Sequence, residues 1–169
     1  MAQTTFSGPV KSLAGFISAG TGNSVDITAD TTLTVAAHAG KLLTVNDADC
    51  KITLPTIVAT TPSDSTDPNQ TNNIGAVYRF FIETAATDLD IKTDGTDKFV
   101  GSLIVGVDDG TKKLFVPAAA NDVMTMNGTT KGGIAGSFVE ITALASAKYL
   151  ISASALIGSG TIATPFANA

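Results

Sequence analysis

The sequence predicts an all-β protein, an antiparallel β-sandwich or jelly-roll-like barrel with an extended apolar N-terminal arm. Short segments rich in Val, Ile and Thr alternate apolar with polar residues, which is the pattern of half-buried strands. Gly, Asn-Gly and Asp-Gly turns separate these segments at near-regular intervals, as they do in sandwiches and barrels. No window of roughly 11 or more residues carries a 3.6-residue apolar period, so helix is expected to be minor.

Residues 1–22 are expected to form the arm, because glycines and a proline interrupt any regular element there. Its apolar side chains nevertheless need a surface on which to lie. Three placements are open: the arm folds back on its own domain, it docks on a neighbouring subunit or larger assembly, or it is a free linker.

Residues 23–169 are expected to form one β domain. Pro55 closes its first group of strands, because proline cannot donate to a ladder. Residues 59–73, with two prolines and many Ser, Thr, Asp and Asn, are an exposed loop, either decoration or a contact loop. The first group of expected strands covers residues 24–28, 32–36, 41–45 and 51–54.

The stretch from residue 74 to residue 94 carries the strongest strand pattern and is predicted to be a hairpin. Tyr78, Phe80 and Ile82 fall on one face of its first strand and require a second layer to cover them. The expected partner strand, residues 88–93, has Leu89 and Ile91 on one side. Asp94-Gly95 then ends it with a tight turn.

Further strands are expected in the second half. Residues 98–107 and 113–116 form a second hairpin with Asp109-Gly110 at its tip. A short strand covers residues 122–126, and a last pair covers residues 137–142 and 148–152.

The charge balance bears on possible partners. Fifteen Asp and Glu against ten Lys and Arg give a net charge of −5, which argues against nucleic-acid binding. No apolar run reaches the length of roughly 18 residues that a membrane helix needs, and no signal peptide begins the chain, so we expect a soluble cytosolic product. Charged residues are only 15%, which suits either a neutral coat or a chain that buries its outside against copies of itself or a scaffold.

The side chains needed for catalysis are scarce, and we expect neither an enzyme nor a cofactor. His38 is the only histidine and is interpreted as a turn residue that hydrogen-bonds the backbone. Cys50, the only cysteine, is interpreted as a small hydrophobe in a strand. Asp-rich turns leave structural calcium open, although none has EF-hand spacing. A carbohydrate-binding or hydrolytic sandwich would need aromatic side chains to stack a sugar, and this chain has few, since Trp is absent.

Four segments together resemble small virion structural proteins of tailed bacteriophages, particularly marine and cyanobacterial ones. In such chains a Thr-rich strand leads to an HAG-K/R turn, a strand ending in Leu-Pro, and then G-x-x-Y-R-F. The segments are TTFSGPVKSLAGF (residues 4–16), TLTVAAHAGKLLTVNDADCKITLP (residues 32–55), GAVYRFFI (residues 75–82), and the late strand 136–141 followed by Lys148-Tyr149. The long loop at residues 59–73 departs from the pattern.

The resemblance implies a non-enzymatic capsid decoration or cement protein that binds the outside of the major capsid shell and stabilises it. Such proteins commonly form homotrimers, assemble in the host cytoplasm and remain on the capsid surface of the virion. A phage tail or head-fibre component is the alternative, and a carbohydrate-binding sandwich a more distant one. On the decoration hypothesis, the arm docks on the major capsid protein or a neighbouring subunit through five apolar anchors: Phe6, Pro9, Val10, Leu13 and Phe16.

Overall fold

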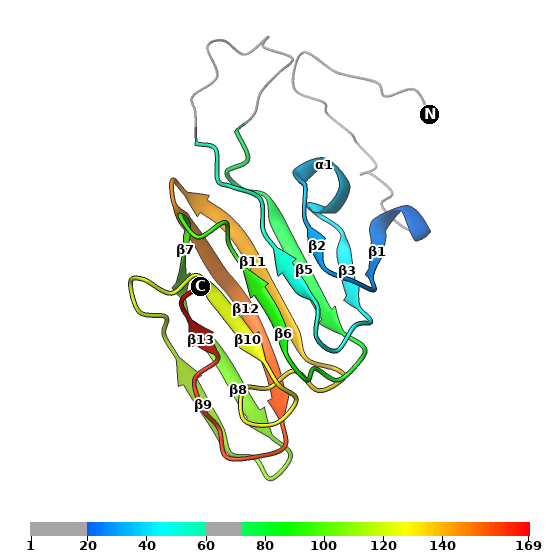
Figure 1. The fold of residues 1–169 in the computed structure, drawn as a ribbon, viewed down its shortest axis with the longest axis vertical. Helices are drawn as coiled ribbons and strands as arrows, with labels where there is room; N and C mark the ends of the chain where they lie inside the picture. The colour runs from blue at the N-terminus through cyan, green and yellow to red at the C-terminus, as the bar shows by residue number, and fades with distance from the viewer. Residues whose placement is uncertain (1–19, 60–71) are drawn as a thin grey trace, which may run out of the picture.

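Two β-sheets packed against each other hold almost all of the regular secondary structure of the described chain (Figure 1). The computed structural model describes residues 20–59 and 72–169. One sheet has eight strands in the order β1-β3-β5-β11-β12-β8-β9, with β7 also paired to β12. The other has five strands in the order β13-β10-β6-β4-β2. The predicted all-β sandwich is confirmed.

The first six strands alternate between the two sheets, so that each pair forms one coil of a short solenoid-like stack. β1, β3 and β5 are parallel neighbours in the larger sheet, and β2, β4 and β6 are parallel neighbours in the smaller one. The bends between sheets stack as well: Asn46 N–H donates to Ile27 O at 2.8 Å, and Thr87 N–H to Ala48 O at 2.7 Å. The strands are β1 (Ser24–Ile27), β2 (Thr31–Thr32), β3 (Leu42–Val45), β4 (Lys51–Thr53), β5 (Val77–Ile82) and β6 (Leu89–Lys92).

The second half adds antiparallel pairs to this stack. β11 pairs antiparallel with β5 and with β12, β10 pairs antiparallel with β6, and β8 pairs antiparallel with β9. Two further strands, β7 and β8, run parallel to β12 along successive parts of its length. The strands are β7 (Lys98–Gly101), β8 (Leu103–Val107), β9 (Lys112–Phe115), β10 (Val123–Met126), β11 (Phe138–Ala145), β12 (Lys148–Gly158) and β13 (Phe166–Ala167).

The predicted hairpin at residues 74–94 is wrong in its pairing. β5 and β6 both exist, but β5 lies in the larger sheet and β6 in the smaller one. Residues 83–88 therefore cross between layers instead of reversing within one. The expected consequence for burial still holds, since Tyr78, Phe80 and Ile82 are all fully buried against the opposite sheet. The sheets are accordingly mixed, with parallel pairings that the sequence patterns did not indicate.

Two other expected strands differ in detail. Residues 35–38 form the short helix α1 (Val35–His38) instead of continuing a strand, because the Thr34 side chain accepts a hydrogen bond from Ala37 N–H and caps it. The segment 98–107 is divided into β7 and β8 at Gly101, which has φ 99°. A Cβ there would lie 2.8 Å from Ile151 O, so this close approach requires glycine.

The remaining predicted pairs are confirmed. β8 and β9 form a hairpin whose tip is Asp109-Gly110, with Gly110 at φ 86°. β11 and β12 form the last pair and are longer than expected. The only helices in the described ranges are α1 and the 3₁₀ turn Thr21–Asn23, so helix is minor as predicted.

Candidate interaction surfaces

The five predicted anchor residues of the arm, Phe6, Pro9, Val10, Leu13 and Phe16, lie outside the described residues. The structure does describe the point from which the arm leaves. Gly20 and the turn Thr21–Asn23 lead directly into β1, the first strand of the larger sheet. The segment predicted to be the arm therefore joins the described chain at one edge of that sheet.

The exposed loop predicted at residues 59–73 is described only at its two ends. Asn73 is buried and joins them: Val58 N–H donates to its Oδ1 at 2.8 Å, and its Nδ2 donates to Thr56 O at 2.9 Å. Asn73 N–H also donates to Val58 O at 3.0 Å. The loop thus starts and ends at one fixed place.

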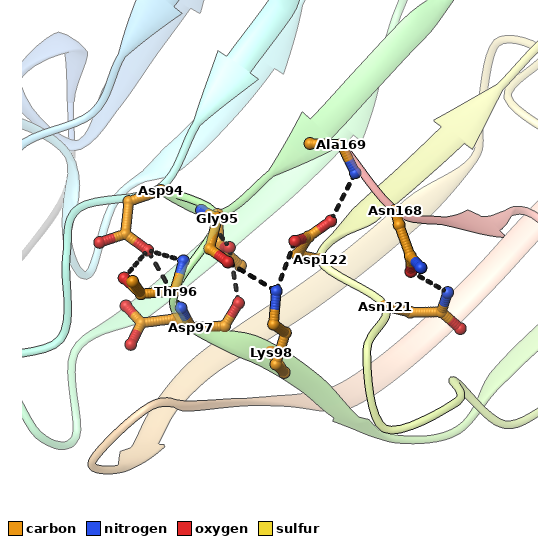
Figure 2. Close-up of polar contacts among 10 residues, drawn as sticks. Asp94, Gly95, Thr96, Asp97, Lys98, Asn121, Asp122, Asn168 and Ala169 are labelled. Carbon is orange, nitrogen blue, oxygen red and sulfur yellow. Dashed lines mark hydrogen bonds and ion pairs between the residues drawn. The ribbon is translucent and has the colours of Figure 1, made fainter.

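A polar cluster around Asp122 holds the end of the chain against β7 and β10 (Figure 2). Lys98 Nζ lies 2.6 Å from Asp122 Oδ2, and Ala169 N–H donates to Asp122 Oδ1 at 2.8 Å. Burial opposes ionisation of Asp122, but these two donors hold the pKa of its carboxyl below the usual value. Asn121 Nδ2 also donates to Asn168 Oδ1 at 2.8 Å. The cluster fixes β13 and the start of β7.

The turn before β7 belongs to the same cluster. Asp94 Oδ1 accepts hydrogen bonds from Thr96 N–H at 2.9 Å and from Asp97 N–H at 3.0 Å, as Figure 2 shows. Partial burial would raise the pKa of Asp94, but hydrogen bonds from Thr96 and neighbouring groups lower it to about 2. Asp97 is buried, which raises the pKa of its carboxyl, while Ile57 N–H donates to Oδ2 at 2.7 Å. This arrangement is structural, because its polar groups bond to one another.

An apolar groove of about 330 Å³ lies beside the Asp122 cluster. Its walls come from β7, from the segment after β9 and from the β11–β12 turn. Two lysines, Lys98 and Lys148, also line the groove. The apolar lining is formed by Phe99, Val100, Gly101, Val116, Pro117, Ala119 and Ala147.

The hairpin of β8 and β9 and the residue that follows it border this groove and carry the two most exposed large apolar side chains among the described residues, Val116 and Leu114. Leu114 is 62% exposed, Val116 is 70% exposed, and Ile104 is 42% exposed. Sequence analysis missed this surface, although the run Leu114-Phe115-Val116 after two lysines was visible. Both of these lysines, Lys112 and Lys113, lie in β9, and Lys113 Nζ donates to Ile162 O at 3.0 Å.

The Asp-rich turns that left structural calcium open do not come together in one site among the described residues. Lys51 Nζ lies 2.9 Å from Asp88 Oδ2 and 3.1 Å from Asp90 Oδ2, so this pair neutralises a cation of the chain itself. Asp47 and Asp49 share a bend, and a hydrogen bond with Asp47 raises the pKa of the Asp49 carboxyl. Across residues 20–59 and 72–169, no three His, Cys, Asp or Glu side chains gather as a metal site would require.

The two candidate catalytic side chains occupy structural positions. Thr34 N–H donates to His38 Nδ1 at 2.9 Å, so His38 caps its own helix as expected of a backbone-bonded turn residue. Cys50 is 2% exposed, and burial together with nearby Asp47 and Asp30 raises its thiol pKa to about 11. A buried thiol with a raised pKa is inert, which agrees with its interpretation as a small hydrophobe.

Comparison with known proteins adds no relatives. No family model, curated protein or solved structure matches the chain. Within the part of the chain that the structure describes, no helix has the length and apolarity needed to cross a membrane.

Proposed function

We propose that this chain is a non-enzymatic virion structural protein, a decoration protein that binds the outside of a phage capsid and stabilises it. The main support for this proposal is the position of two elements at opposite edges of the larger sheet. The arm is attached beside β1, and the exposed apolar hairpin ends in β9, at the opposite edge of the same eight-stranded sheet. A rigid sheet with a contact element at each edge suits a protein that bridges neighbours in a shell.

The mechanism we propose is repeated weak binding. The arm contacts the major capsid protein or a neighbouring subunit, and copies of the chain associate with one another, as homotrimers in the family that it resembles. Each contact needs little affinity by itself, because contacts repeated over a shell combine into strong overall binding. A domain whose core polar groups bond internally, as around Asp122, supplies the rigidity that such bridging requires.

The arm is tested by adding the purified protein to capsids that lack it. Deletion of residues 1–17 removes all five proposed anchors and leaves β1 intact, so the domain is expected to stay folded but to lose binding. Phe6→Ser with Phe16→Ser is the finer variant, and Thr4→Ser with Thr5→Ser is its matched control in the same arm. Native occupancy by the deletion variant would refute the arm as the contact.

A tail or head-fibre component is the alternative that we keep. It would use the same fold at a few copies per particle, so the copy number distinguishes it from a decoration protein. A carbohydrate-binding role would require measurable binding to a glycan, which the same purified protein can be used to test.

A further inference from the structure

β9 is the last strand of the larger sheet, and no described residue pairs with its outer edge. Val107 N–H donates to Thr111 O at 2.9 Å, which fixes the backbone groups that face β8. Because inward and outward groups alternate along an antiparallel strand, the N–H and C=O groups of Lys112, Leu114 and Val116 face away from β8. Such a row of free donors and acceptors is a template for another strand.

The same edge is apolar on its outer face. Ile104 lies opposite Leu114 in the register of the hairpin, so both side chains are on one face, and Val116 follows two residues later. All three are more than two-fifths exposed, at 42%, 62% and 70% respectively. Edge strands are usually protected by charge, and here Lys112 alone points a charge outward on this face.

We propose that β9 pairs with β9 of a second copy of this chain, antiparallel across a two-fold axis beside Leu114. The two eight-stranded sheets then become one continuous sheet. Leu114 faces Leu114 of the second copy, and Lys112 faces Val116, so outward-facing backbone groups meet their counterparts. An axis beside Lys112 or Lys113 would instead place two like charges directly opposite each other, which is unfavourable. The edge is therefore complementary to itself, as a two-fold contact requires.

Charge at the ends of the strand supports a second copy as the occupant. Antiparallel pairing brings the hairpin tip, Asp108-Asp109, of one copy toward the segment after β9 of the other copy, where Val116, Pro117 and Ala119 line the apolar groove. Lys98 and Lys148 line that groove. Lys98 is already paired with Asp122, whereas Lys148 forms no ion pair with any described residue. Each acidic tip thus approaches Lys148 of the other copy, and the symmetry of the dimer makes this contact twice. This contact goes beyond the proposed function, because it needs no capsid and is additional to a three-fold assembly.

Sedimentation velocity of the full chain over a concentration series tests the proposal. The unmodified chain is expected to pass from monomer to dimer as its concentration rises. Leu114→Lys and Leu114→Glu each place like charges against each other and should weaken the dimer at least roughly tenfold, or about 1.4 kcal/mol. An equimolar mixture of the two variants should restore a dimer, because position 114 then meets an opposite charge.

The matched control is Leu42→Lys, which changes an exposed leucine, 42% exposed, in β3, several strands away from β9 in the same sheet. It should leave the dimer unchanged. An unmodified chain that stays monomeric, an oligomer insensitive to Leu114→Lys, or a mixture that forms no dimer would each overturn the proposal. Should a variant misfold, amide hydrogen exchange of the unmodified chain decides instead: the amides of Lys112, Leu114 and Val116 must gain protection as concentration rises.

Discussion

Two neighbouring tyrosines should respond in opposite directions to the same substitution. Tyr78 on β5 and Tyr149 on β12 are both fully buried, and their rings meet edge to face with centroids 6.4 Å apart. The Tyr149 hydroxyl donates to Pro55 O at 2.5 Å, whereas the Tyr78 hydroxyl has no hydrogen-bond partner among the described residues. Burial raises the pKa of Tyr78 to about 12, so it stays protonated.

The magnitudes follow from this difference. Tyr78→Phe removes a buried hydroxyl that has lost its water without gaining a partner, so the free energy of unfolding should rise by about 1 kcal/mol. Tyr149→Phe removes a hydrogen bond and leaves the Pro55 carbonyl without this donor. The free energy of unfolding should therefore fall by about 1–2 kcal/mol. Both substitutions keep the ring packing, since phenylalanine preserves the edge-to-face pair.

Urea unfolding followed by far-UV circular dichroism measures both variants under identical conditions. An unchanged slope of the free energy of unfolding against urea concentration would show that the substitution has not altered the unfolded state. The unfolding midpoints then report the change in stability. Destabilisation by Tyr78→Phe equal to that of Tyr149→Phe would refute the reasoning, because it would mean that the Tyr78 hydroxyl is satisfied.

Three further predictions concern the polar cluster and the buried thiol. Asp122→Asn should lower the free energy of unfolding by about 2 kcal/mol, because it leaves the Lys98 ammonium without its counter-charge; an unchanged urea midpoint would contradict this. The folded-state pKa of Asp94, about 2, lies below its ordinary value of 3.8, so its stabilisation is present above about pH 4 and is lost as pH falls through about 2. Asp94→Asn should therefore flatten the loss of thermal stability between pH 4 and pH 2, and an unaltered profile would contradict the assignment. Cys50 should resist a thiol reagent at pH 8 in the native protein and react fully in denaturant, and rapid native labelling would contradict its burial.

The strands themselves could be predicted from local patterns, but their partners could not. Alternation placed Tyr78, Phe80 and Ile82 correctly on one buried face, because side-chain direction depends only on the strand's own period. Alternation does not say which sheet receives the next strand, and residues 83–88 are long enough to reverse or to cross. The hairpin of β8 and β9 was predictable because Asp109-Gly110 dictates a tight reversal.

The candidate interaction surfaces were harder to predict from the sequence than the strands were. Exposure of Leu114 depends on β9 being the last strand of its sheet, which is a property of strand order and not of local sequence. The Asp122 cluster joins residues far apart in the chain, Lys98, Asp122 and Ala169, without a motif of fixed spacing. The arm anchors were identified from composition and resemblance alone and remain a prediction.

On the proposed function this chain belongs to a tailed phage, and its copy number in purified particles of that phage is the most direct test. Quantitative mass spectrometry gives the ratio of this chain to the major capsid protein. A ratio near one to one, or one trimer per local three-fold position, is the result predicted for a capsid decoration protein. A few copies per hundred capsid subunits would assign the chain to the tail or a fibre, and its absence from the particle would contradict a structural role in the virion altogether.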